Sequence, residues 1–300
     1  MSRPLIILTC MRSYSSLTCG MLGQHPELYG LPEINPFVAD TIGETMRQFR
    51  SVRPRSLDGI CRTIAQLEFG GQTRETITDA REWLQRRSNW SAGKLLDHIA
   101  EAVAPKAWVD KSISTVLRED RLRRAIRIVP DARFLHLTRH PRPTCRSLFE
   151  LQSKNKARSA NGNGSRSLPD PDPDPEEAWM RTNQNVLRFV AELPPGQCMH
   201  IRGEDLLSEP ERYLEQICTW LGIRFDDDAL TTMLHPEASV YARIGPRNAP
   251  FGNDPNFLRN PVFDKRASPA ASLAGPLEWR TKPPMFARET VETAQQLGYR

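Results

Sequence analysis

Four short apolar runs, each followed by a polar turn and a helical stretch, limit the folds open to this chain. They lie at residues 5–9, 107–109, 134–137 and 199–201. Compact apolar runs of this kind are typical of strands that are buried on both faces. Because strands that alternate with helices build parallel sheets, the sequence predicts an α/β fold with a central parallel sheet flanked by helices.

The turn after the first run has the composition of an anion-binding site. Arg12, Ser13, Ser15 and Ser16 stand between the predicted strand and a helix expected at 17–24. A helix N-terminus presents unpaired backbone N–H groups and the positive end of the helix dipole. With the hydroxyls and one fixed cation, these donors predict a site for a phosphate or sulfate group. The turn is not a Walker A loop, since G-x-x-x-x-G-K-[ST] is missing.

Two segments together resemble the sulfotransferases that use 3′-phosphoadenosine-5′-phosphosulfate (PAPS). Residues 11–17, with His-Pro at 25–26 and Glu33, resemble the family's 5′-phosphosulfate loop, above all that of tyrosylprotein sulfotransferases and bacterial relatives. Residues 134–148 resemble its 3′-phosphate motif, with an arginine at the strand end and a serine in the next helix. Weaker matches lie at 108–112 and 200–210. The resemblance implies a P-loop-NTPase-like sulfotransferase fold.

The resemblance also implies roles for individual residues. PAPS would be the donor and its product would be adenosine 3′,5′-bisphosphate (PAP), held by Arg12, Ser13, Tyr14, Ser15, Ser16, Leu17, Arg139 and Ser147. Glu33 would be the base for the acceptor, expected to be a hydroxyl of a small molecule. Lys111 would neutralise charge on the leaving oxygen, and Arg12 would stabilise the sulfuryl oxygens. No metal is required.

This chain departs from the family pattern at two positions of the loop. Tyr14 stands where the family has glycine, and Met11 replaces a common proline. If the turn needs a positive φ at residue 14, a tyrosine there is strained, since only glycine adopts that conformation without cost.

Three other functions remain open on the residues. A small-molecule kinase should carry a Walker lysine, which is missing, and a metal-holding aspartate, for which Asp110 is the plausible candidate. A nucleic-acid binder should carry aromatic residues among its basic ones, but the arginine-rich stretch 47–62 offers only Phe49 and is typical of a solvated face. A non-catalytic sulfonucleotide sensor would lack Glu33 and Lys111. We therefore expect a small-molecule acceptor and no nucleic acid.

The remaining sequence predicts the organisation of the chain. We expect one sulfotransferase domain over residues 1–300, with a mobile loop at about 155–175 and a loop-rich segment at about 246–284. No apolar run approaches the length of a membrane-spanning helix, so no membrane association is expected. The six scattered cysteines, without a C-x-x-C pair, are typical of free thiols in a reducing compartment, which favours a cytoplasmic location. The net charge of +5 excludes none of these functions. The oligomeric state is not predicted.

Overall fold

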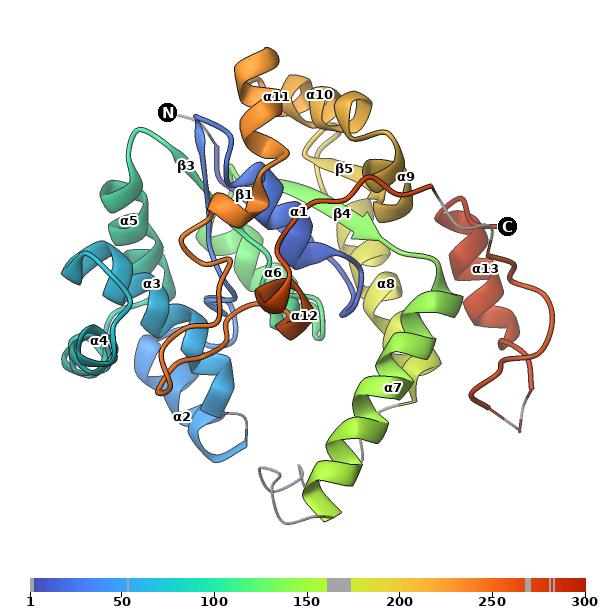
Figure 1. Ribbon diagram of the computed structural model, residues 1–300, viewed down its shortest axis with the longest axis horizontal. Helices are drawn as coiled ribbons and strands as arrows, with labels where there is room; N and C mark the ends of the chain where they lie inside the picture. Colours follow the sequence, from blue (N-terminus) through green and yellow to red (C-terminus); the bar gives the residue numbers. More distant parts are fainter. Residues whose placement is uncertain (1–2, 53, 161–173, 268–270, 281, 283) are drawn as a thin grey trace.

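Five parallel strands form the centre of the molecule (Figure 1). The structure, a computed structural model, describes residues 3–52, 54–160, 174–267, 271–280, 282 and 284–300. The strand order is β2-β3-β1-β4-β5, and all paired neighbours are parallel. The strands are β1 (Leu5–Leu8), β2 (Leu28–Gly30), β3 (Ala107–Asp110), β4 (Arg133–Thr138) and β5 (Cys198–Arg202). The predicted α/β fold with a central parallel sheet is confirmed.

Helices cover both faces of this sheet (Figure 1). They are α1 (Ser15–Leu22), α2 (Ile42–Val52), α3 (Asp58–Phe69), α4 (Arg74–Arg86), α5 (Ala92–Val103), α6 (Glu119–Ile128), α7 (Pro141–Ala160), α8 (Pro175–Ala191), α9 (Gly203–Ser208), α10 (Pro210–Leu221), α11 (Asp227–Met233), α12 (Pro255–Arg259) and α13 (Arg288–Gln296). No described helix has the length and apolar character needed to cross a lipid bilayer.

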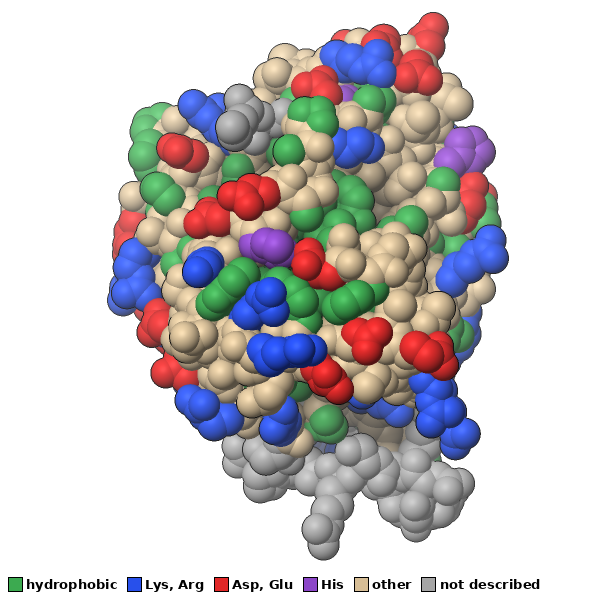
Figure 2. Space-filling model, turned by 90° about the vertical axis from the view of Figure 1, so that its left-hand side faces the viewer, with side chains coloured by type: hydrophobic (Ala, Val, Ile, Leu, Met, Phe, Trp, Pro, Cys, Tyr) green, Lys and Arg blue, Asp and Glu red, His purple; other side chains and the backbone are tan. Residues whose placement is uncertain are grey.

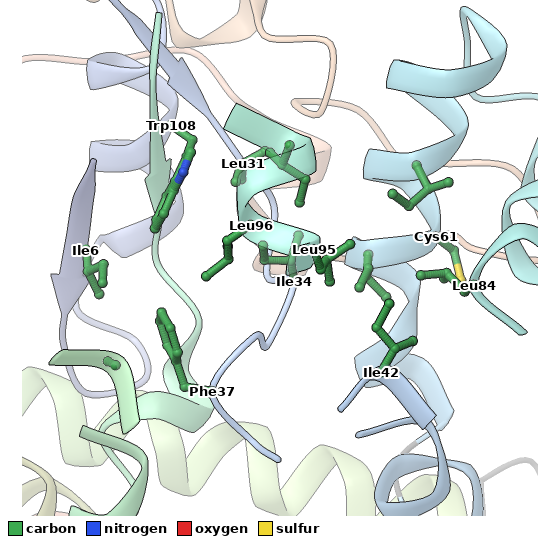
Figure 3. Packing of buried hydrophobic residues seen from close by; sticks show 14 of the residues in the cluster. Ile6, Leu31, Ile34, Phe37, Ile42, Cys61, Leu84, Leu95, Leu96 and Trp108 are labelled. Carbon is green, nitrogen blue, oxygen red and sulfur yellow. The ribbon is translucent and has the colours of Figure 1, made fainter. Parts of the chain in front are cut away.

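Alternate residues of each strand feed two separate cores. Ile6 and Leu8 point to one face, where they join Trp108 and side chains of α3 to α6 and α8 (Figure 3). Leu5 and Ile7 point to the other face, toward α1, α9, α10 and α11. Successive strand residues point to opposite faces, so a strand covered on both sides must be apolar throughout. This explains the uninterrupted apolar runs of the sequence.

The strand order places two turns beside each other. From β1 the chain crosses to β2 and β3 on one side, and then to β4 and β5 on the other. Strands β1 and β4 pair directly, with Leu8 opposite His136. In open parallel sheets, ligands bind at the carboxyl ends of the strands where the order reverses. The turns after β1 and β4 meet at such a point.

The structure corrects the predicted loop at 155–175. Residues 155–160 are not a loop but the last six residues of α7, which ends at Ala160. Alanine, lysine and arginine favour a helix there, and the first glycine comes only at position 162. Residues 161–173 of that predicted loop lie outside the described residues, and Pro175 already begins α8. In the described part of 246–284, α12 is the one helix.

Among the described arginines of the stretch 47–62, one differs from its prediction, and Arg53 lies outside the described residues. On the face shown in Figure 2, on the side of α4 and α5, Lys and Arg side chains alternate with Asp and Glu, as is typical of a solvated surface. Arg47 follows the prediction because its side chain is exposed. Arg62 does not, because it is only 1% exposed. A buried arginine needs specific partners.

Candidate active site

The turn after β1 has the backbone conformation of an anion-binding loop. Arg12 has a φ of 66° and Tyr14 a φ of 65°, both in the left-handed region. Left-handed residues in such a turn direct successive backbone N–H groups toward one side. Ser15 begins α1, and among the described residues no side chain caps that helix at Tyr14. Its first N–H groups are therefore open to a ligand.

Tyr14 has the strained left-handed backbone expected for it, and its ring makes two close contacts. The guanidinium of Arg139 lies 4.4 Å from the centre of the ring, a cation–π contact. The ring also packs on Gly203, where an added Cβ would lie 2.7 Å from a ring carbon. A left-handed non-glycine residue costs about 1–3 kcal/mol, which a partly buried cation–π pair can offset in part. The tyrosine thus holds Arg139 against the loop.

The two turns predicted to bind one ligand are in direct contact. Arg139 Nη1 donates a hydrogen bond to the carbonyl oxygen of Arg12 over 2.8 Å. Arg12 Nε in turn donates to Ser147 Oγ of α7 over 2.9 Å. Arg139 Nε and Ser13 Oγ are buried and have no hydrogen-bond partner within the described part of the chain. Buried polar atoms are rarely left without partners, so these two atoms fit an anionic ligand.

These residues surround a cavity of about 410 Å³, here called the loop cavity. All eight residues predicted to hold the donor line it: Arg12, Ser13, Tyr14, Ser15, Ser16, Leu17, Arg139 and Ser147. The sequence did not predict the remaining lining residues, which are Leu207, Asp254, Asn256, Phe257, Asn260, Val262 and Arg266. Most of these come from the segment around α12.

Lys111 connects the loop to Glu33. Its side chain is completely buried just after β3. Its Nζ donates to Ser16 Oγ over 2.9 Å and to Glu33 Oε1 over 2.7 Å. The Glu33 side chain is 32% exposed. The neighbouring Asp110 is buried and accepts hydrogen bonds from the hydroxyl and backbone N–H of Ser112, and its burial raises its pKa to about 6.

Glu33 faces a second cavity of about 520 Å³, here called the Glu33 cavity. It adjoins the loop cavity, and both are lined by Arg12, Ser15, Ser16 and Asp254. Its other walls come from α2 and α7, which stand on either side of α12 (Figure 1), and from the segment that leads into α6. Lys111 lines neither cavity. Because the two cavities adjoin, a molecule in the loop cavity and a molecule in the Glu33 cavity would contact each other beside Ser16 and Glu33.

Residues 251–254, here called the bridge segment, contact both cavities. The N–H of Glu33 donates to the carbonyl oxygen of Gly252 over 2.6 Å. The N–H of Asp254 donates to Ser16 Oγ over 3.0 Å, and its carboxylate forms an ion pair with Arg12. Gly252 has a φ of 110°, and a Cβ there would lie 2.8 Å from the backbone of Gly59. The bridge segment lies in the loop-rich segment predicted at about 246–284, but its contacts with the two cavities were not predicted, and neither was α12, although Asp254-Pro255 is a typical start of a helix.

Arg62 fastens the bridge segment to α3. Its guanidinium donates to the carbonyl oxygens of Phe251 and Arg243 over 2.9 Å each, and to Gln72 Oε1 over 2.6 Å. Burial lowers the pKa of Arg62 to about 10. Because three of its N–H groups have partners inside the protein, Arg62 replaces backbone pairing for a segment that has no regular secondary structure.

Replacing Arg62 by methionine should destabilise the protein by about 3 kcal/mol. The change leaves two buried carbonyl oxygens without their charged donor, and each such bond contributes about 1.5–3 kcal/mol. Urea denaturation followed by circular dichroism measures the loss. Arg47→Met, at an exposed position of α2, should stay within about 0.5 kcal/mol of the parent protein. Equal losses in both variants would contradict a structural role for Arg62.

His136 is a buried polar residue that belongs to the core and not to the candidate site. It lies within β4, and its Nε2 is 3.1 Å from Asn183 Oδ1. Burial lowers its pKa to about 3. His136 is therefore a neutral, hydrogen-bonded core residue away from both cavities.

All six cysteines are unpaired, and five of them are buried. No three His, Cys, Asp or Glu side chains cluster as metal ligands within the part of the chain that the structure describes.

Comparison with known proteins identifies the family of this chain. The model of the Sulfotransferase family matches residues 4–227, which include both turns, Glu33 and Lys111. The chain belongs to the sulfotransferase family. No curated protein sequence matches this family member.

Two solved sulfotransferase structures share the fold over the whole chain. One is the sulfotransferase domain from the curacin biosynthetic pathway, with 24% identity, a TM-score of 0.76 and coverage of 100% of this chain and 99% of that one. The other is the sulfotransferase domain from the Synechococcus PCC 7002 olefin synthase, with 22% identity, a TM-score of 0.75 and coverage of 100% and 97%. At sequence identities of 24% and 22%, the similarity to these two structures establishes the fold of this chain and nothing further.

Proposed function

We propose that this protein transfers the sulfuryl group of PAPS to a hydroxyl group of a small molecule. The observation that carries the proposal is the contact between the two cavities. The loop cavity has the donors that a doubly anionic nucleotide needs, and the Glu33 cavity opens beside it with a carboxylate at the junction. Lys111 bonds to both sides of that junction.

The loop cavity would hold the nucleotide at its two anionic ends. Arg139, with its unpaired Nε, and Ser147 would bind the 3′-phosphate, because a guanidinium and a hydroxyl match its oxygens. The backbone N–H groups at the start of α1, with Ser13 and Ser15, would bind the 5′-phosphosulfate. Each charge-assisted hydrogen bond contributes about 1.5–3 kcal/mol, so Arg139 and Ser147 together would favour a nucleotide that carries the 3′-phosphate by about a hundredfold or more.

The transfer step uses the residues at the junction. The acceptor oxygen attacks the sulfur atom, the bond from sulfur to the bridging phosphate oxygen breaks, and PAP leaves. The proton of the acceptor hydroxyl passes to Glu33. Lys111 and Arg12 stabilise the negative charge that develops on the leaving oxygen and the sulfuryl oxygens. Positioning and charge stabilisation do most of the work, as in phosphoryl transfer.

Binding of PAP should raise the melting temperature, and ATP with magnesium should raise it much less. A ligand at about 100 times its Kd stabilises the folded state by about 2.7 kcal/mol, which corresponds to roughly 5 °C for a chain of this size. Differential scanning fluorimetry measures both shifts. Equal shifts from PAP and ATP would favour a kinase, and no shift from PAP would contradict the proposed donor.

Asp254→Asn should tighten PAP binding by about tenfold. The substitution removes a negative charge from the loop cavity and releases Arg12 from its ion pair. An asparagine can still cap α12, as Asp254 Oδ1 does by accepting a hydrogen bond from the N–H of Asn256 over 2.8 Å. Isothermal titration calorimetry with PAP gives the Kd. Asp228→Asn, at an exposed position outside both cavities, is the control, and weaker binding by Asp254→Asn would contradict the expectation.

A further inference from the structure

One arginine in the Glu33 cavity forms no ion pair with any residue that the structure describes. Arg121, near the start of α6, lines that cavity. Its Nη1 donates to the carbonyl oxygen of Ser114 over 3.0 Å, and its Nε is buried without a partner. Among the described residues it forms no ion pair, because the adjacent Asp120 pairs with Arg118 and Arg124 instead. Burial and the nearby charge of Arg118 lower the pKa of Arg121.

The other charged groups of the cavity are paired. Glu33 bonds to Lys111, and Asp254 bonds to Arg12. Arg121 is therefore the one charged residue of this lining that has no ion pair within the described part of the chain. At its guanidinium the positive charges of Arg118 and Arg124 outweigh the attraction of Asp120. A guanidinium that is partly removed from water and has no ion pair is unfavourable, unless a ligand supplies the negative charge.

Apolar atoms make up most of the exposed lining of this cavity, which also holds uncharged polar side chains such as Asn35 and Gln48. Met11 and Leu117 keep 38% and 45% of their surface exposed, although both are hydrophobic. The other apolar lining residues are Phe49, Ile113, Leu151 and Pro255. The volume of about 520 Å³ falls in the range of small-molecule sites. Exposed apolar side chains around a cavity are typical of a binding surface for an apolar ligand.

We propose that the acceptor is an amphiphilic hydroxy acid, whose carboxylate pairs with Arg121 while its hydroxyl lies at Glu33. The apolar body of the molecule packs between these two ends, against Met11, Phe49 and Leu117. This inference rests on the proposed function for the identity of the acceptor, but the binding of a carboxylate at Arg121 does not depend on sulfuryl transfer. Arg121 is then a specificity-determining residue, because it selects one end of the acceptor.

The test compares ω-hydroxy carboxylic acids of increasing chain length with their methyl esters. Calorimetry with PAP present gives the affinity for each compound, and turnover with labelled PAPS is recorded separately. The variants are Arg121→Gln, which removes the charge, and Arg121→Lys, which keeps it. Arg123→Gln is the matched control, because Arg123 lies on the same helix with its side chain 64% exposed and lines neither the loop cavity nor the Glu33 cavity.

The acid of the best chain length should bind about tenfold to a hundredfold more tightly than its ester, as expected for one charge-assisted contact. That preference should disappear in Arg121→Gln and persist in Arg121→Lys and Arg123→Gln. Equal binding of acid and ester at every length, no binding of any acid, or a preference that survives in Arg121→Gln would overturn the inference. An acid preference that depends on Arg121, but without sulfation, would support the inference and count against the proposed function.

Discussion

Glu33→Gln should lower turnover by about 10²- to 10⁴-fold, the usual effect of losing a general base. Glutamine keeps the shape of the side chain, and its amide oxygen can still accept the hydrogen bond from Lys111. It cannot take a proton from the acceptor. Because Glu33 lines the Glu33 cavity and not the loop cavity, the Kd for PAP should stay within about twofold.

Single-turnover assays with labelled PAPS and calorimetry with PAP separate the two effects of this substitution. Glu101→Gln, at an exposed position near the end of α5, serves as the control and should behave like the parent protein. Unchanged turnover in Glu33→Gln would remove Glu33 as the base. A large loss of PAP binding would instead indicate that the carboxylate orders the loop through Lys111 and Ser16.

Lys111→Met should lower turnover by about 10²- to 10³-fold, the effect expected when a fixed charge at the developing anion is removed. The substitution also breaks the link between Ser16 and Glu33. Methionine has a similar length and suits a buried position, and both former partners lie at cavities where water can reach them. We therefore expect the variant to fold.

The kcat and the melting temperature of Lys111→Met should both be measured, because together they separate a role in the reaction from a role in folding. Lys106→Met is the matched control, because Lys106 is exposed at the opposite end of the same strand. A stable Lys111→Met variant with turnover within about threefold of the parent would exclude Lys111 from the reaction. A variant that melts far below the parent would show that the lysine is needed mainly for folding, contrary to its proposed role.

The candidate site residues that lie in short strand-turn-helix segments could be proposed from the sequence. A buried strand, a turn and a helix follow one another within about twenty residues, so their composition indicates their structure directly. All eight predicted donor-binding residues line one cavity for this reason. Strand β2 was missed because its three residues, Leu28–Gly30, are too few to show a periodic pattern. The extension of α7 to Ala160 was missed because its last turns are polar.

Contacts between distant segments could not be predicted in the same way. Asp254 pairs with an arginine 242 positions away, and nothing near Asp254 in the sequence indicates that partner. Arg62 and Arg121 look like surface residues, because a charged side chain in an amphipathic helix usually faces solvent. Only the folded structure shows that one fastens a loop and that the other lies in a cavity.

The bridge segment has a consequence for the kinetics of the enzyme. In the proposed function, Asp254 pairs with the Arg12 guanidinium that the nucleotide would contact, while the backbone carbonyl of Gly252, two residues earlier, holds the N–H of Glu33, the proposed base. Entry of the proposed nucleotide would therefore release Asp254 at one end of the bridge segment, while Gly252 at its other end supports the Glu33 cavity. The two substrates are then expected to associate in a compulsory order, nucleotide first, so that the unloaded enzyme discriminates poorly among alcohols.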